Sequence, residues 1–193
     1  VRTRSAPVGC RSSPRCGSTA PRGGPGPGTG RRDQSPCRAI RADATITRTF
    51  SSVEAVAVVV YTTALDFGLL TTPAVADLAK RFRSHHQEHA ALFVGTTRDL
   101  GSAPFTDPNP IVMQQVQPLL DGMRDETTAV NLALDVETIL ADTYQATMGT
   151  FADKSFNVAS MSVGGAEARL ELGERVEIHR RIDDLLRRHH AHR

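Results

Sequence analysis

The sequence predicts an all-α fold, an antiparallel four-helix bundle over residues 42–170. Apolar residues recur at spacings of three and four through several long segments, as they do on the buried face of a helix. Glycine and proline separate these segments by short connections, which favour antiparallel neighbours. No long segment alternates between apolar and polar residues, as a half-buried strand would.

Residues 1–41 and 171–193 flank the predicted bundle. The first stretch contains nine Arg, one Asp and no Lys, and it is rich in Pro and Gly. It carries too little apolar surface to offset the entropy lost on ordering, so we expect a disordered leader. An alternative interpretation is that a shifted reading frame encodes this stretch. The last stretch is a charged tail rich in His and Arg.

Composition argues against two kinds of partner. The formal net charge is only +2, and the Arg-rich leader lacks the aromatic side chains that stack on bases, so we expect no nucleic-acid partner. No stretch approaches the roughly 20 apolar residues of a membrane-spanning helix, so we expect no transmembrane segment.

The first two helices form a predicted hairpin. We expect the first helix to begin near Thr45 and to end at Gly68. Its three consecutive valines would also suit a strand, but the segment is too long for one strand and has no period of two. Thr72 followed by Pro73 is typical of an N-cap and the first helical residue, and Gly101 ends this second helix.

A long connection follows. Residues 101–109 form a predicted loop, with Asn109 as the cap of a short helix that starts at Pro110. Pro118 breaks or kinks this short helix, because proline lacks a backbone donor and its ring clashes with the preceding turn.

The third and fourth helices form a second predicted hairpin. The third helix runs to Met148, where Gly149 ends it, and Asp153 caps the fourth. Gly164 and Gly165 either weaken the fourth helix locally or allow another backbone to approach it closely.

An internal repeat is the strongest functional signal. Glu54 precedes Tyr61 by seven residues in the first helix, and Glu137 precedes Tyr144 by seven in the third. Seven residues are nearly two helical turns, so each Glu shares a helix face with its Tyr. Both Glu residues fall on the apolar side, where a carboxylate must be paired, protonated or bound to metal.

The partner helices continue the repeat. Glu54 is followed 32 residues later by His86, with His89 three residues on, and Glu137 is followed 30 residues later by Glu167. Side chains three residues apart on a helix point to one place. Di-iron carboxylate bundles combine one Glu from each of two helices with Glu-x-x-His from the other two.

These residues resemble those of actinobacterial ferritin-like domain proteins over roughly residues 43–169. The matching motifs are Val60-Tyr61-Thr62-Thr63-Ala64-Leu65-Asp66, His86-x-x-His89-Ala90, Pro104-Phe105-Thr106-Asp107-Pro108-Asn109-Pro110, Leu134-Asp135-x-Glu137, Asp142-Thr143-Tyr144 and Met161-Ser162-Val163-Gly164-Gly165-x-Glu167-Ala168-Arg169. The resemblance implies a ferritin-like bundle and suggests an extracytoplasmic or cell-envelope location, although no export signal is readable.

The resemblance implies a set of metal ligands, and two tyrosines are compatible with a role in holding a Glu. The ligand candidates are Glu54, His86, His89, Glu137 and Glu167, and the tyrosines are Tyr61 and Tyr144. The family pattern ends its fourth helix with Glu-Ala-Arg-His, whereas this chain has Leu170 at the last position. A two-metal centre would therefore lack one ligand.

Other interpretations of these residues remain open. His85 pairs with His89 at a spacing of four and is a rival ligand to His86, whereas Glu88 points elsewhere and is expected in solvent. Glu167 would also suit a surface ion pair with Arg169. The two tyrosines would also suit ordinary core positions with a partner for the hydroxyl.

The sequence thus predicts a ferritin-like metal-binding protein, with iron or manganese as the metal because those ions suit carboxylate and imidazole ligands. A two-metal centre would support oxidase or peroxide chemistry, if Leu170 leaves it intact. The alternative is a helical bundle of the cell envelope or of a stress response, with no metal and no enzymatic activity.

Overall fold

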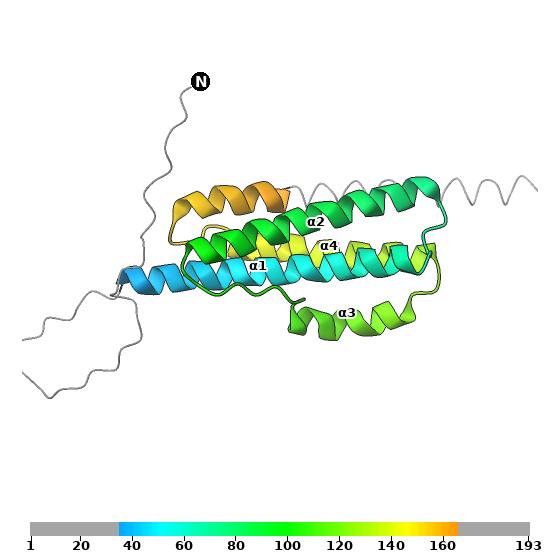
Figure 1. Cartoon of the computed structure of the whole chain (residues 1–193), viewed down its shortest axis with the longest axis horizontal. Coiled ribbons are helices and arrows are strands. Elements are labelled where there is room, and N and C mark those ends of the chain that lie inside the picture. The colour runs from blue at the N-terminus through cyan, green and yellow to red at the C-terminus, as the bar shows by residue number, and fades with distance from the viewer. Residues whose placement is uncertain (1–34, 166–193) are drawn as a thin grey trace, which may run out of the picture.

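A computed structural model describes residues 35–165, which form five helices and contain no strands (Figure 1). The helices are α1 (Ser35–Asp66), α2 (Pro73–Asp99), α3 (Pro110–Gly122), α4 (Glu126–Thr147) and an unlabelled fifth helix over residues 154–165. The all-α prediction is confirmed. No helix in this part of the chain is long and apolar enough to cross a membrane.

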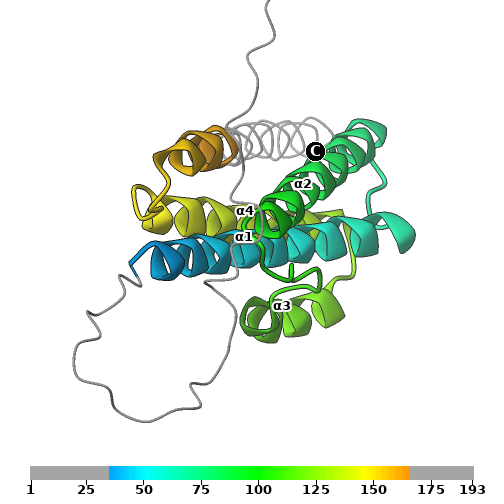
Figure 2. The same cartoon turned by 60° about the vertical axis from the view of Figure 1, so that its left-hand side comes forward.

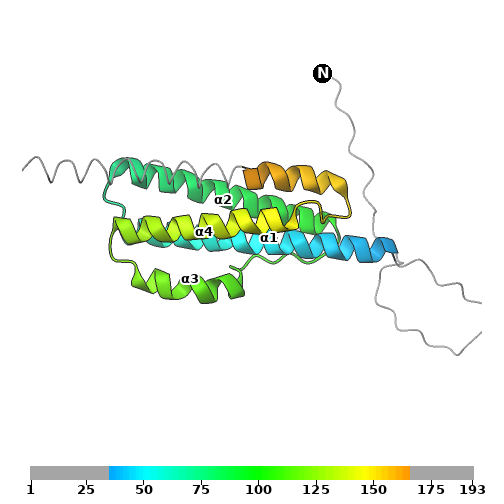
Figure 3. The same cartoon turned by 180° about the vertical axis from the view of Figure 1, so that it is seen from behind.

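The helices α1, α2, α4 and the fifth helix form the bundle, and α3 packs outside it. Figures 1 and 3 show α2 running back along α1, and the fifth helix running back along α4. The connection between α2 and α4 carries α3, which lies against α1 and α4 on the side away from α2 (Figure 2). The bundle is therefore two helix hairpins joined by one long crossover, as the sequence predicts.

Three helices end at the predicted glycines. Gly68, Gly101 and Gly149 have φ values of +63°, +73° and +76°, in the left-handed region that glycine enters without a steric penalty. These glycines stop α1, α2 and α4.

The predicted starts of α2 and α3 are also confirmed, with one difference at the cap of α2. The Asn109 side chain accepts hydrogen bonds from the amides of Ile111 and Val112 at the start of α3. Thr72 occupies the N-cap position of α2, but its side chain makes no capping bond. Its backbone N–H instead donates to Glu126 Oε2 at 2.7 Å, which ties the start of α2 to the start of α4.

The first helix is longer than predicted, because α1 begins at Ser35 rather than near Thr45. Residues 35–41 were expected to belong to the leader but form the first turns of α1. The next turns present small polar side chains to the interior, where they make specific hydrogen bonds. The buried polar residues of this half of α1 are Asp43, Thr47, Ser51 and Ser52.

These buried polar groups attach α1 to two loops. Both carboxylate oxygens of Asp43 accept backbone N–H groups, from Ala152 at 2.7 Å and Asp153 at 3.0 Å. Ser51 donates to the carbonyl of Phe105 at 2.8 Å. Of the buried polar residues only Asp43 precedes Thr45, and because its burial does not register in the apolar period, the start of α1 was placed too late.

Proline and glycine act differently within the helices. Pro118 does not end α3, which continues to Gly122. Gly164 lies so close to α4 that a Cβ added there would be 2.7 Å from Tyr144 Cβ, whereas a Cβ at Gly165 would meet nothing within 4 Å. The close-approach interpretation is therefore correct for Gly164.

Candidate metal centre

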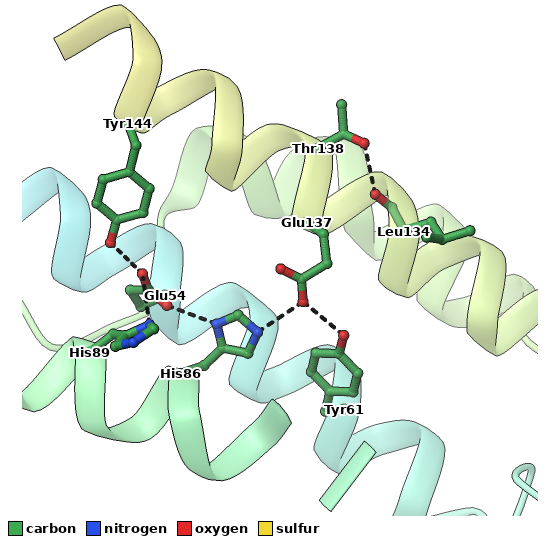
Figure 4. Close-up of polar contacts among 8 residues, drawn as sticks. All are labelled: Glu54, Tyr61, His86, His89, Leu134, Glu137, Thr138 and Tyr144. Atoms are coloured by element: carbon green, nitrogen blue, oxygen red, sulfur yellow. Dashed lines mark hydrogen bonds and ion pairs between the residues drawn. The ribbon is translucent and has the colours of Figure 1, made fainter. Parts of the chain in front are cut away.

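Six of the predicted site residues converge inside the bundle (Figure 4). Glu54 and Tyr61 lie on α1, His86 and His89 on α2, and Glu137 and Tyr144 on α4. The helix periodicity places each pair on one face, and the three helices turn those faces toward one another. The site is thus built from the helices that the sequence repeat selects.

Three of these side chains are completely buried. Glu54, His86 and Glu137 each have 0% of their surface exposed. An isolated charge at such a depth would be very unfavourable, so these groups need partners or a metal ion. They obtain partners from one another.

His86 lies between the two carboxyl groups. Its Nδ1 is 2.8 Å from Glu54 Oε2, and its Nε2 is 2.9 Å from Glu137 Oε1. Burial alone would lower the pKa of His86, but the hydrogen bonds to Glu137 and Glu54 and the charges of both groups raise this pKa well above its ordinary value. Without metal, His86 is therefore an imidazolium that donates from both ring nitrogens.

Glu54 is the counterion of this imidazolium. Burial raises the pKa of Glu54, but hydrogen bonds from His86, His89 and Tyr144 and the charge on His86 outweigh burial, and the resulting pKa is lower than usual. Glu54 is therefore ionised at neutral pH and ready to bind a cation.

The two tyrosines form hydrogen bonds between α1 and α4. Tyr61 of α1 donates to Glu137 Oε1 of α4 at 2.7 Å, and Tyr144 of α4 donates to Glu54 Oε1 of α1. Each tyrosine holds the carboxylate of the opposite helix, although the sequence places it on the same face as the carboxylate of its own helix. Spacing along one helix cannot reveal this exchange, because it depends on how the two helices pack.

His89 is the most accessible of the six side chains. About a fifth of it is exposed, and its Nδ1 lies 3.7 Å from Glu54 Oε1. Glu54, His86 and His89 each offer a ligand atom within 4.8 Å of those of the other two. One carboxylate oxygen and two imidazole nitrogens gathered so closely suit a divalent transition-metal ion.

Aromatic rings enclose the centre. Phe50 packs against Phe93 and Tyr144, with ring centroids 4.9 and 4.4 Å apart. On the other side, Tyr61 stacks on His86 with centroids 5.5 Å apart and an interplanar angle of 17°. The two tyrosines were predicted beside the site, whereas nothing in the spacing of Phe50 and Phe93 indicated that they would pack near it.

Two described residues next to the site histidines, His85 and Glu88, are not part of this group. His85 is exposed and its ring lies near Phe82, so the structure favours His86 over this rival. Glu88 is exposed, as predicted. Glu167, Arg169 and Leu170 lie outside the described residues, and the role of Glu167 stays a prediction.

Comparison with known proteins agrees with this architecture. Residues 42–171 match the model of the ferritin-like domain family. No curated protein and no solved structure shows a significant match. The match covers about two thirds of the chain, including every helix of the bundle, and the chain therefore belongs to the ferritin-like domain family.

Proposed function

We propose that this protein binds iron or manganese at the group formed by Glu54, His86 and His89. The observation that carries the proposal is the convergence of three metal-binding side chains within 4.8 Å inside a ferritin-like domain. Two imidazoles and one carboxylate are also the donor set of many non-haem iron sites. The residues present thus fit the metals that the family resemblance implies.

The protein's own side chains prepare this site. Glu54 supplies negative charge, and Tyr144 restricts its rotation by donating to Oε1. A cation held by His86 Nδ1 would displace the proton of that nitrogen to solvent, since a nitrogen that binds metal cannot carry hydrogen. When bound, iron or manganese would supply one-electron chemistry toward dioxygen or peroxide, the oxidase chemistry that the resemblance implies.

The enclosure determines what can reach the centre. Glu54 and His86 have no exposed surface, whereas about a fifth of the His89 side chain is exposed. Such a site admits an ion or a small oxidant more readily than a large organic molecule. The preferred substrate is therefore small, such as ferrous iron, dioxygen or peroxide.

A second candidate function is a bundle that needs no metal. The hydrogen bonds Tyr144–Glu54–His86–Glu137–Tyr61 form one continuous chain in which the buried charges already have partners. A network of this kind would hold the helices together in a protein that serves the cell envelope by binding other proteins.

Metal analysis of the purified full-length chain decides between these two functions. We expect bound iron or manganese after anaerobic loading and gel filtration, lost in Glu54→Gln and strongly reduced in His89→Gln. The matched controls are Glu88→Gln and His85→Gln, which change exposed residues of the same types and should bind as much metal as the wild type. A wild-type chain that binds no metal, and whose stability a chelator leaves unchanged, would refute the metal-binding proposal.

A further inference from the structure

The two ring nitrogens of His86 face different groups. Nδ1 points to Glu54, the carboxylate that also lies beside His89, whereas Nε2 points across the bundle to Glu137. Figure 4 shows this division, with Glu54 and His89 on one side of the imidazole and Glu137 with Tyr61 on the other. Among residues 35–165, the metal-binding group therefore lies at the Nδ1 edge of the ring.

From this division, and on the basis of the proposed function, we infer that the centre holds one metal ion per chain and that Glu137 is a positioning residue rather than a ligand. The ion takes His86 through Nδ1, together with Glu54 and His89. Glu137 accepts the hydrogen of His86 Nε2 and thereby leaves Nδ1 as the nitrogen that binds the ion.

The shape of imidazole argues against a second ion. In two-metal sites the ions lie about 3.5–4 Å apart, and a carboxylate can bridge them because its two oxygens point the same way. The nitrogens of an imidazole point to opposite edges of the ring, so ions bound to both would lie much farther apart. This chain has His86 where the di-iron pattern Glu-x-x-His has its carboxylate on the second helix, so α2 supplies no bridging carboxylate.

The contacts of Glu137 match those of a carboxylate that orients a ligand. Its Oε1 accepts from His86 Nε2 at 2.9 Å and from the Tyr61 hydroxyl at 2.7 Å. Metal-binding histidines generally donate their other ring N–H to such a carboxylate, which fixes the tautomer and the ring orientation. Tyr61 supports this arrangement twice, because it holds Glu137 and also stacks on the His86 ring.

A one-ion centre also accounts for Leu170. The two-metal pattern requires a histidine at that position, so its absence makes a two-metal site incomplete. A centre built from Glu54, His86 and His89 needs no ligand there.

The test loads the full-length chain with Mn²⁺ alone and measures stoichiometry, affinity and the electron paramagnetic resonance spectrum. We expect one ion per chain at saturation and the simple hyperfine pattern of an isolated ion. Glu137→Gln should still bind one ion at saturation, with an affinity about 10–100-fold weaker, the usual effect of removing such a carboxylate. Tyr61→Phe should weaken binding in the same direction and serves as the second variant if Glu137→Gln does not fold.

Two controls separate positioning from general stability. Asp142→Asn changes an exposed carboxylate of the same helix and should leave the affinity unchanged. The visible absorption of bound Co²⁺ reports the ligand field, and should shift in Glu137→Gln but not in Asp142→Asn.

The possible outcomes separate the inference from the proposed function. Two ions per chain, or the spectrum of a coupled pair, would overturn the inference and leave metal binding intact. Loss of all metal in Glu137→Gln, as complete as in Glu54→Gln, would show that Glu137 is a ligand. A wild-type chain that binds no Mn²⁺ or iron would overturn the proposed function and the inference with it.

Discussion

Gly164 offers the sharpest test of how the fifth helix packs on α4. An added methyl group would lie 2.7 Å from Tyr144 Cβ and 3.1 Å from Tyr144 Cγ. These atoms join the tyrosine to its backbone and cannot swing away, so Gly164→Ala must push the two helices apart. Gly165 is the matched control, because a methyl group there meets nothing within 4 Å.

The expected magnitudes follow from two opposing effects. Overpacking costs about 1–3 kcal/mol, while replacing glycine by alanine in a helix gains about 1 kcal/mol, so Gly164→Ala should destabilise the protein by up to about 2 kcal/mol. Gly165→Ala has only the second effect and should be neutral or stabilising by up to about 1 kcal/mol.

Urea unfolding of the metal-free variants, followed by circular dichroism, measures this difference. Gly164→Ala should also weaken metal binding, because Tyr144 would shift and its hydroxyl holds Glu54. Equal stabilisation by the two substitutions would refute the close packing of Gly164 on Tyr144.

Two further predictions concern stability. In the metal-free protein the raised pKa of His86 contributes stability that is complete below about pH 6.5 and disappears as the pH rises through the raised value. The lowered pKa of Glu54 contributes stability that is complete above about pH 4.5 and disappears as the pH falls. The urea midpoint of the wild type should therefore be highest between about pH 4.5 and 6.5. In Glu54→Gln the urea midpoint should depend less on pH. The same pH dependence in this variant as in the wild type would contradict a buried ion pair between Glu54 and His86. Asp43→Ala should destabilise the protein by about 2–3 kcal/mol in thermal unfolding, because two backbone N–H groups lose their acceptor. Asp135 is exposed, so the stability of Asp135→Ala should stay within about 0.5 kcal/mol of the wild type.

The local signals in the sequence predicted the helix ends well. Glycine at the ends of α1, α2 and α4 and the Asn109 cap act within a few residues, so their effect does not depend on the rest of the fold. The start of α1 was missed because the buried position before Thr45 holds Asp43, whose partners are remote in sequence. Buried polar residues of this kind resemble exposed ones until those partners are known.

The repeat predicted which side chains meet but not how they divide their roles. Glu54, His86 and Glu137 were all expected to be ligands, and the hydrogen bonds that make them different arise from three separate helices. Whether His85 or His86 faces inward depends on a rotation of about 100° around α2. That rotation is set by the packing of Phe82 and Phe93 in the core.

The crossed tyrosines have a mechanical consequence for the bundle. Apolar surfaces between α1 and α4 are tolerant of sliding, since one aliphatic contact can replace another. The hydrogen bonds of Tyr61 and Tyr144 do not tolerate sliding, because a shift of α4 along α1 in either direction would break their bonds to Glu137 and Glu54. The two bonds therefore fix the register of the helices, and any event that disconnects the carboxylates would release it.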